Sequence, residues 1–86
     1  MLEVKVFGSK PPCARCKELT KRAQNIADKY PGEISVTHYD ALSEEGDKYG
    51  VMMTPTLVIN DKVAAVGKLP EEKDIERMIM NELGEN

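Results

Sequence analysis

The sequence predicts an α/β fold in which four strands form one mixed sheet and helices cover both of its faces. Three patterns predict it: an alternating apolar stretch at the N-terminus, a helical apolar stripe directly after it, and two short strand-like segments joined by a turn near residue 60. The predicted order of elements is β-α-β-α-β-β-α. We expect residues 1–86 to form a single domain, because a chain of this length has room for one hydrophobic core.

The first half of the chain predicts a βαβ unit. Residues 2–7 alternate in polarity and predict a strand, and residues 8–12 predict a stiff loop because they include two prolines. Residues 13–30 predict a helix that a proline–glycine pair ends, and residues 34–39 predict a second strand, parallel to the first. The apolar face of the predicted helix consists of Cys16, Leu19, Ala23, Ile26, Ala27 and Tyr30.

The second half of the chain predicts a short helix, a hairpin and a final helix. The polar stretch 40–50 contains the start of the short helix, and residues 56–59 and 63–66 predict two strands. The turn 60–62 between them is predicted to be tight, because Asn and Asp tolerate positive φ. Pro70 is predicted to open the final helix. The apolar stripe of that helix is Ile75, Met78, Ile79 and Leu83.

Composition and charge exclude several classes of partner. The net charge of −3, with no basic stripe, argues against nucleic-acid binding. The longest apolar run, residues 63–66, is far too short to cross a membrane. The chain opens on a strand pattern and not on a signal peptide, so we expect a cytoplasmic protein. We expect it to be a monomer.

Both cysteines lie in one motif, at the junction between the first predicted strand and the first predicted helix. Cys13 and Cys16 are separated by two residues, and such a pair between a strand and a helix predicts a redox dithiol. Structural disulfides are rare in the cytoplasm, which favours a catalytic, redox-sensing or metal-binding pair. A dithiol carries electrons itself, so we expect no bound cofactor and no resident metal.

The order of elements, with Cys-x-x-Cys opening the first helix, resembles the thioredoxin fold in its short, glutaredoxin-sized form. Residues 10–16 resemble the glutaredoxin motif Lys-Pro-x-Cys-x-x-Cys, residues 48–56 resemble the thioredoxin stretch Lys-Tyr-Gly-Ile-x-x-x-Pro-Thr, and residues 60–67 resemble the thioredoxin hairpin with its glycine. The likeness covers nearly the whole chain and is closest to the small thioredoxin/glutaredoxin-like proteins of archaea. It implies a protein disulfide oxidoreductase that passes electrons from a thioredoxin-reductase-type donor to oxidised target proteins.

The sequence also departs from these families at two places. Thioredoxins carry a buried acid six residues before the first cysteine, and Phe7 stands there in this chain. Glutaredoxins hold glutathione with paired glycines and a following acid, whereas Gly67 stands alone. We therefore expect no carboxylate that deprotonates Cys16, and we do not expect glutathione to be used.

The helix start predicts different roles for the two cysteines. Cys13 is expected at the exposed tip as the attacking thiolate, and Cys16 is expected one turn in, on the buried face, as the resolving thiol. A helix N-terminus favours an anion by roughly 1 kcal/mol. Arg15 and Lys10 are predicted to add smaller contributions that solvent screens.

The resemblance implies a substrate site around a cis peptide bond at Pro55. That bond is expected to bring Thr54 beside Cys13 and to turn its backbone groups outward, so that an extended substrate segment can pair with them. Of the two adjacent methionines, Met52 and Met53, we expect one in the core and one on the rim. The predicted apolar rim consists of Pro12, Ala14, Met52 and Met53.

Three other functions stay open. The two thiolates could hold a soft metal or metalloid, the protein could be a glutathione-linked glutaredoxin, or the cysteines could form a structural disulfide. A closed zinc site takes four ligands, and the one histidine, His38, is predicted on a distant strand as a surface or edge residue. Tyr30, Tyr39 and Tyr49 are predicted to be packing residues.

Overall fold

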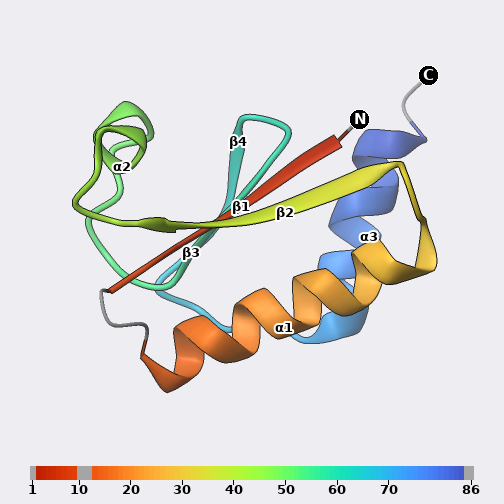
Figure 1. Cartoon of the computed structure of the whole chain (residues 1–86), viewed down its shortest axis with the longest axis horizontal. Helices are drawn as coiled ribbons and strands as arrows, with labels where there is room; N and C mark the ends of the chain where they lie inside the picture. Colours follow the sequence, from red (N-terminus) through yellow and green to blue (C-terminus); the bar gives the residue numbers. More distant parts are fainter. Residues whose placement is uncertain (1, 10–12, 85–86) are drawn as a thin grey trace.

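The computed structural model describes residues 2–9 and 13–84, which form one mixed four-stranded sheet and three helices (Figure 1). The elements are β1 (Leu2–Gly8), α1 (Ala14–Lys29), β2 (Ile34–Asp40), α2 (Glu44–Lys48), β3 (Thr56–Ile59), β4 (Lys62–Val66) and α3 (Glu72–Leu83). This order confirms the predicted β-α-β-α-β-β-α arrangement. None of the helices in the described part of the chain is long and apolar enough to span a membrane.

The sheet has the order β2-β1-β3-β4, so β1 lies between two neighbours. β1 pairs in parallel with β2, from Leu2 opposite Ile34 to Gly8 opposite Asp40, and α1 makes the crossover between them. β3 pairs antiparallel with β1, and β4 continues antiparallel. The carboxyl ends of β1 and β2 therefore lie at the same edge of the sheet, beside the start of α1.

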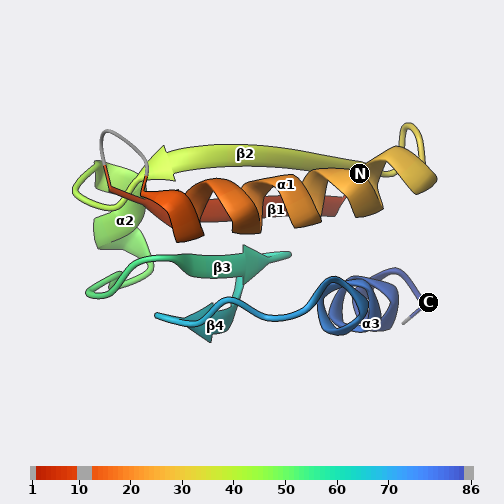
Figure 2. The same ribbon diagram turned by 90° about the horizontal axis from the view of Figure 1, so that it is seen from below.

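The main hydrophobic core lies between the sheet and the pair α1 and α3. Figure 2 shows α1 in front of β1 and β2, and α3 beside it. The predicted apolar face of α1 is buried except at Tyr30, which is the half-buried C-cap that packs against the core. Ile75 and Ile79 of α3 are fully buried. The buried members of this core are Leu2, Val4, Val6, Leu19, Ala23, Ile26, Ala27, Ile34, Leu57, Ile59, Ile75 and Ile79.

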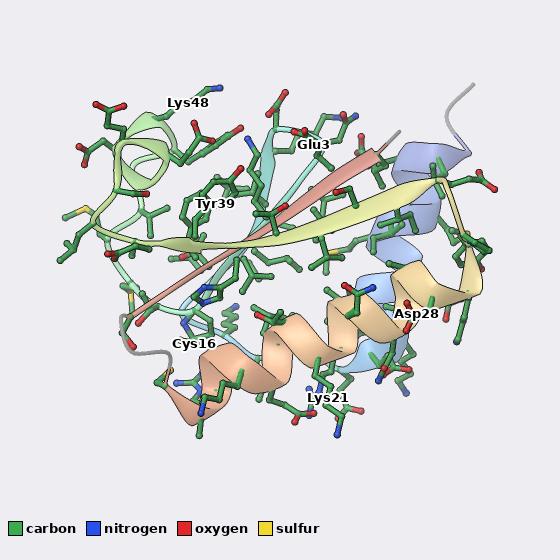
Figure 3. The ribbon with its side chains drawn as sticks, viewed as in Figure 1. Glu3, Cys16, Lys21, Asp28, Tyr39 and Lys48 are labelled. Carbon is green, nitrogen blue, oxygen red and sulfur yellow. The ribbon has the colours of Figure 1, made fainter. Side chains whose placement is uncertain are left out.

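The opposite face of the sheet holds an aromatic cluster over which α2 folds. Phe7 stacks on Tyr39 at a centroid distance of 5.4 Å and meets Tyr49 at 5.8 Å, which confirms the packing role of these two tyrosines. Tyr39 lies on the side of the sheet away from α1 (Figure 3). Lys5 is also buried here, and its ammonium donates to Glu45 and to the Tyr49 hydroxyl, each at 3.0 Å. These two acceptors raise the pKa of Lys5, so it stays charged within the cluster.

Three predicted boundaries are corrected. Cys13 is not the first residue of α1 but its N-cap, with extended backbone angles and a side chain that accepts a hydrogen bond. Pro70 does not open the last helix, which begins at Glu72, because the Pro70 carbonyl accepts from Arg22 of α1 at 2.8 Å. The hairpin turn has two residues, with φ of 53° and 66°, and Lys62 already belongs to β4.

We expect Tyr49→Phe to destabilise the fold by about 1.5 kcal/mol, because the variant loses an acceptor for a buried charge. The same hydroxyl donates to Asp61 and is the main cause of the lowered pKa of that carboxyl. A lowered carboxyl pKa stabilises the fold above the unfolded-state value and stops doing so as the pH falls through the folded-state value. Urea unfolding should therefore show a larger difference at pH 7 than below pH 3.

Tyr39→Phe is the matched control for this prediction. It keeps the ring that stacks on Phe7, and no hydrogen bond from the Tyr39 hydroxyl to another described residue is found. Equal unfolding midpoints for wild type and Tyr49→Phe at pH 7 would contradict the role given to the Lys5 cluster.

Candidate dithiol active site

Cys13 occupies the N-cap of α1 and is partly exposed. Its Sγ accepts the backbone N–H of Cys16 at 3.2 Å, and its carbonyl accepts the N–H of Lys17 at 2.9 Å. The first N–H groups of a helix have no partner within the helix, and the helix dipole favours negative charge at this end. The sulfur of Cys13 thus takes the position that an Asp or Ser side chain commonly fills.

The surroundings of Cys13 lower the pKa of its thiol. The largest cause is a hydrogen bond from the Cys16 side chain, followed by the backbone N–H of Cys16. The Arg15 N–H and the Ser9 hydroxyl act in the same direction, and desolvation opposes them. Donors to the sulfur stabilise the thiolate, which is the reactive form of cysteine.

Cys16 is fully buried, on the side of α1 that faces the sheet (Figure 3). It lies against Gly8 at the end of β1, where an added Cβ would be only 2.9 Å from both the Cβ and the Sγ of Cys16. A side chain at residue 8 would therefore push the first turn of α1 away from the sheet. Both cysteines are free thiols in this structure.

Arg15 connects the motif to the loop before β3. Its guanidinium donates to the Gly67 carbonyl at 3.1 Å, and the Gly67 N–H donates to the Pro55 carbonyl at 2.8 Å. The side chain predicted to support the Cys13 charge is therefore engaged with Gly67. Lys10 and Pro12, which were also predicted for this site, lie outside the described residues.

The peptide bond between Thr54 and Pro55 is cis, as the resemblance implied. Pro55 is buried and Thr54 is half-buried, while Ala14 on α1 is exposed. The expectation that one of the adjacent methionines packs in the core is wrong: Met52 is 91% exposed and Met53 is 58% exposed. Residues 51–55 form a loop and not an extended strand, so alternation of side chains between two faces does not apply.

His38 is the residue whose place the sequence reasoning missed. It lies on an edge strand, as predicted, but it is half-buried and its Nε2 atom is fully buried. An added Cβ on Gly8 would lie 2.8 Å from this Nε2. The predicted parallel pairing of β2 with β1 could have located His38. Parallel strands end at the same edge of the sheet, so residues near the end of β2 must lie close to the cysteines.

A closed zinc site takes four ligands, which is more than the two thiols supply. Among residues 2–9 and 13–84, no three His, Cys, Asp or Glu side chains gather closely enough to hold a metal ion. A zinc ion bound as in a closed site would need ligands from beyond that part of the chain.

The fold and the dithiol at the start of α1 define a thiol–disulfide oxidoreductase of the thioredoxin type. Residues 2–80 match the sequence profile of the Thioredoxin domain family, and the chain belongs to that family. A thioredoxin-family oxidoreductase works with a reductase as electron donor and with protein targets.

Two archaeal relatives extend over most of the chain. It is 32% identical over 82 residues to a probable thioredoxin of Archaeoglobus fulgidus, covering 92% of this chain and 87% of the relative. It is 26% identical over 77 residues to a thioredoxin of Methanocaldococcus jannaschii, covering 87% and 89%. Chloroplastic thioredoxin z shares the fold, with a TM-score of 0.77 at 15% identity over 100% of this chain and 80% of the other.

We expect Gly8→Ala to destabilise the protein by about 1–3 kcal/mol, the usual range for overpacking a core. The reason is the 2.9 Å approach of the new methyl group to Cys16, whose backbone cannot retreat without moving α1. Chemical unfolding measures the effect. An unchanged unfolding midpoint would mean that the first turn of α1 is not held against β1.

We expect the Cys13 thiol to titrate below the ordinary range for cysteine. The rate of its alkylation as a function of pH, measured by mass spectrometry in the protein with both cysteines, reports this titration. Ser9→Ala should raise the pKa of Cys13, because it removes a donor to the sulfur. Identical profiles for the two proteins would exclude Ser9 as a contributor.

Proposed function

We propose that this protein reduces disulfide bonds of target proteins by thiol–disulfide exchange, with Cys13 as the attacking sulfur and Cys16 as the resolving one. The Cys13 thiolate attacks one sulfur of the target disulfide, the target S–S bond breaks, and one target sulfur leaves as a thiolate. The Cys16 sulfur then attacks Cys13, which releases the second target thiolate and leaves a Cys13–Cys16 disulfide. Two electrons have passed to the target.

The observation that carries this proposal is the unequal environment of the two cysteines. Cys13 is partly exposed, caps the helix and has a lowered pKa, while Cys16 is fully buried behind it. A reactive thiolate must be both accessible and stabilised, and Cys13 alone meets both conditions. A buried second thiol can attack only the Cys13 sulfur itself, once that sulfur is bonded to the target.

We assign substrate binding to the surface around Pro55. Arg15 and Gly67 tie the first turn of α1 to the Pro55 loop, so this loop and the dithiol keep a common position. Met53 and Ala14 are exposed beside these links and offer apolar contact to an extended target segment. The Thr54 backbone is the part proposed to pair with that segment.

We propose that electrons flow from a reductase through the dithiol to the target protein, in a reducing compartment. A thioredoxin-reductase-type protein would reduce the Cys13–Cys16 disulfide again, and a reducing compartment such as the cytoplasm would favour that direction. We propose a monomeric carrier with no bound cofactor. Comparison of a thioredoxin reductase with glutathione as electron source separates this carrier from a glutathione-linked enzyme.

Reduction of insulin disulfides by the wild type, Cys13→Ser and Cys16→Ser tests the proposal. Cys13→Ser should abolish turnover, because no attacking sulfur remains. Cys16→Ser should also stop turnover but should accumulate a covalent mixed disulfide between Cys13 and the target, visible by mass spectrometry. Lys17→Ser is the matched control, since it places a serine next to Cys16 and leaves both thiols intact.

Two outcomes would contradict the proposal. Undiminished turnover by Cys13→Ser would remove the assigned role of that sulfur. A trapped adduct on Cys16 in Cys13→Ser, with none on Cys13 in Cys16→Ser, would reverse the order of the two cysteines.

A further inference from the structure

A buried nitrogen beside the dithiol has no hydrogen-bond partner among the residues that the structure describes. Nε2 of His38 is the one buried side-chain nitrogen or oxygen that lacks a partner within the described part of the chain. Buried polar atoms in native proteins are nearly always satisfied, so an exception calls for an explanation. The exchange reaction proposed for Cys13 and Cys16 makes no use of this imidazole.

Gly8 places this nitrogen next to the resolving sulfur. The space that a Gly8 side chain would fill lies 2.8 Å from Nε2 of His38 and 2.9 Å from Sγ of Cys16. The two atoms therefore line the same small space and are no farther apart than the sum of these distances. Parallel pairing of β2 with β1 sets His38 opposite Val6, and the start of α1 sets Cys16 over the end of β1.

Few other titratable side chains of the described residues face His38. β1 presents no titratable side chain on this face, because the alternate residues there are apolar or glycine. On its own strand the nearest such group is Asp40, whose carboxylate accepts the N–H of Leu42 at 2.9 Å. Helix α1 contributes Cys16 and two lysines to the surroundings of His38. The residues that border a surface depression together with His38 are Lys17, Thr20 and Lys21.

The resolving step needs a proton acceptor at this position. Cys16 is fully buried, and its sulfur must lose a proton before it can attack Cys13. Phe7 stands where thioredoxins carry a buried acid, and its ring packs on Tyr39 and Tyr49 on the far side of the sheet. Imidazole accepts and releases protons within the physiological pH range, and His38 also reaches the surface depression, through which the proton can leave.

We propose that His38 is the proton acceptor for Cys16 in the resolving step, an inference that rests on the proposed exchange reaction. The Cys16 S–H bond breaks, and its proton passes to His38 Nε2, directly or through one water. The Cys16 sulfur bonds to Cys13 as the bond between Cys13 and the target sulfur breaks, and the target sulfur leaves with the electron pair. The imidazolium then gives its proton to solvent or to the departing thiolate.

The same group serves the reverse direction. When a donor dithiol attacks the Cys13–Cys16 disulfide at Cys13, the Cys16 sulfur leaves as a thiolate. His38 in its protonated form then returns a proton to Cys16. The donor supplies the two electrons, and the histidine moves only the proton.

Rapid mixing of the reduced protein with excess hydroxyethyl disulfide separates the two steps. Acid-quenched samples, analysed by mass spectrometry, give the rate at which the Cys13 mixed disulfide forms and the rate at which it resolves. In His38→Gln we expect formation to proceed at the wild-type rate and resolution to slow by about 100-fold, the low end of general base contributions. The pH dependence of resolution should differ between the wild type and His38→Gln, because only the wild type carries the imidazole.

His38→Asn is measured in parallel, and both variants are checked by circular dichroism so that misfolding is recognised. Lys21→Gln is the matched control, because it removes a titratable side chain from the same depression and should resolve at the wild-type rate. The inference is overturned if either histidine variant, correctly folded, resolves at the wild-type rate with the wild-type pH profile, or if Lys21→Gln slows resolution equally. A wild type that forms no mixed disulfide would instead overturn the exchange reaction on which the inference rests.

Discussion

The close approach of α1 to the end of β1 at Gly8 is the constraint on which the site depends. Cys16 can enter the interior only because residue 8 has no side chain, since an added Cβ would be 2.9 Å from it. Burial of Cys16 in turn fixes how far the first turn of α1 lies from the sheet. That turn presents its free N–H groups to Cys13 at the N-cap, so the chemistry of the exposed sulfur follows from packing beneath it.

The residues on the far face of the sheet anchor α2, and α2 leads into the loop around Pro55. α2 has five residues, too few to be stable alone, and it is anchored where Lys5 meets Glu45 and the Tyr49 hydroxyl. A buried charge is tolerated when partners satisfy it, and breaking such a set is far more costly than a surface ion pair. The loop that carries Met53 and Pro55 begins directly after this anchor, so the cluster helps to position that loop.

Local patterns explain how much of this could be predicted from the sequence. Element types and order were predictable because the periodicities are clear, and Asn60 with Asp61 identified the hairpin turn through their tolerance of positive φ. Residues with non-local partners were not predictable. Pro70 matches a helix start, yet its carbonyl is held by Arg22, and the expected alternation of Met52 and Met53 between two faces fails because their segment forms a loop.

The sequence by itself determined the class of fold, the position of the dithiol at a helix start and the division between an exposed and a buried cysteine. These depend on neighbours within one turn or one strand, and such neighbours can be read directly from spacing. Only the tertiary structure decided that Lys5 is buried, that Arg15 reaches Gly67 and that His38 lies beside Cys16. Each of these contacts joins segments far apart in the chain, and their geometry follows from the strand order, which the pattern within one segment does not encode.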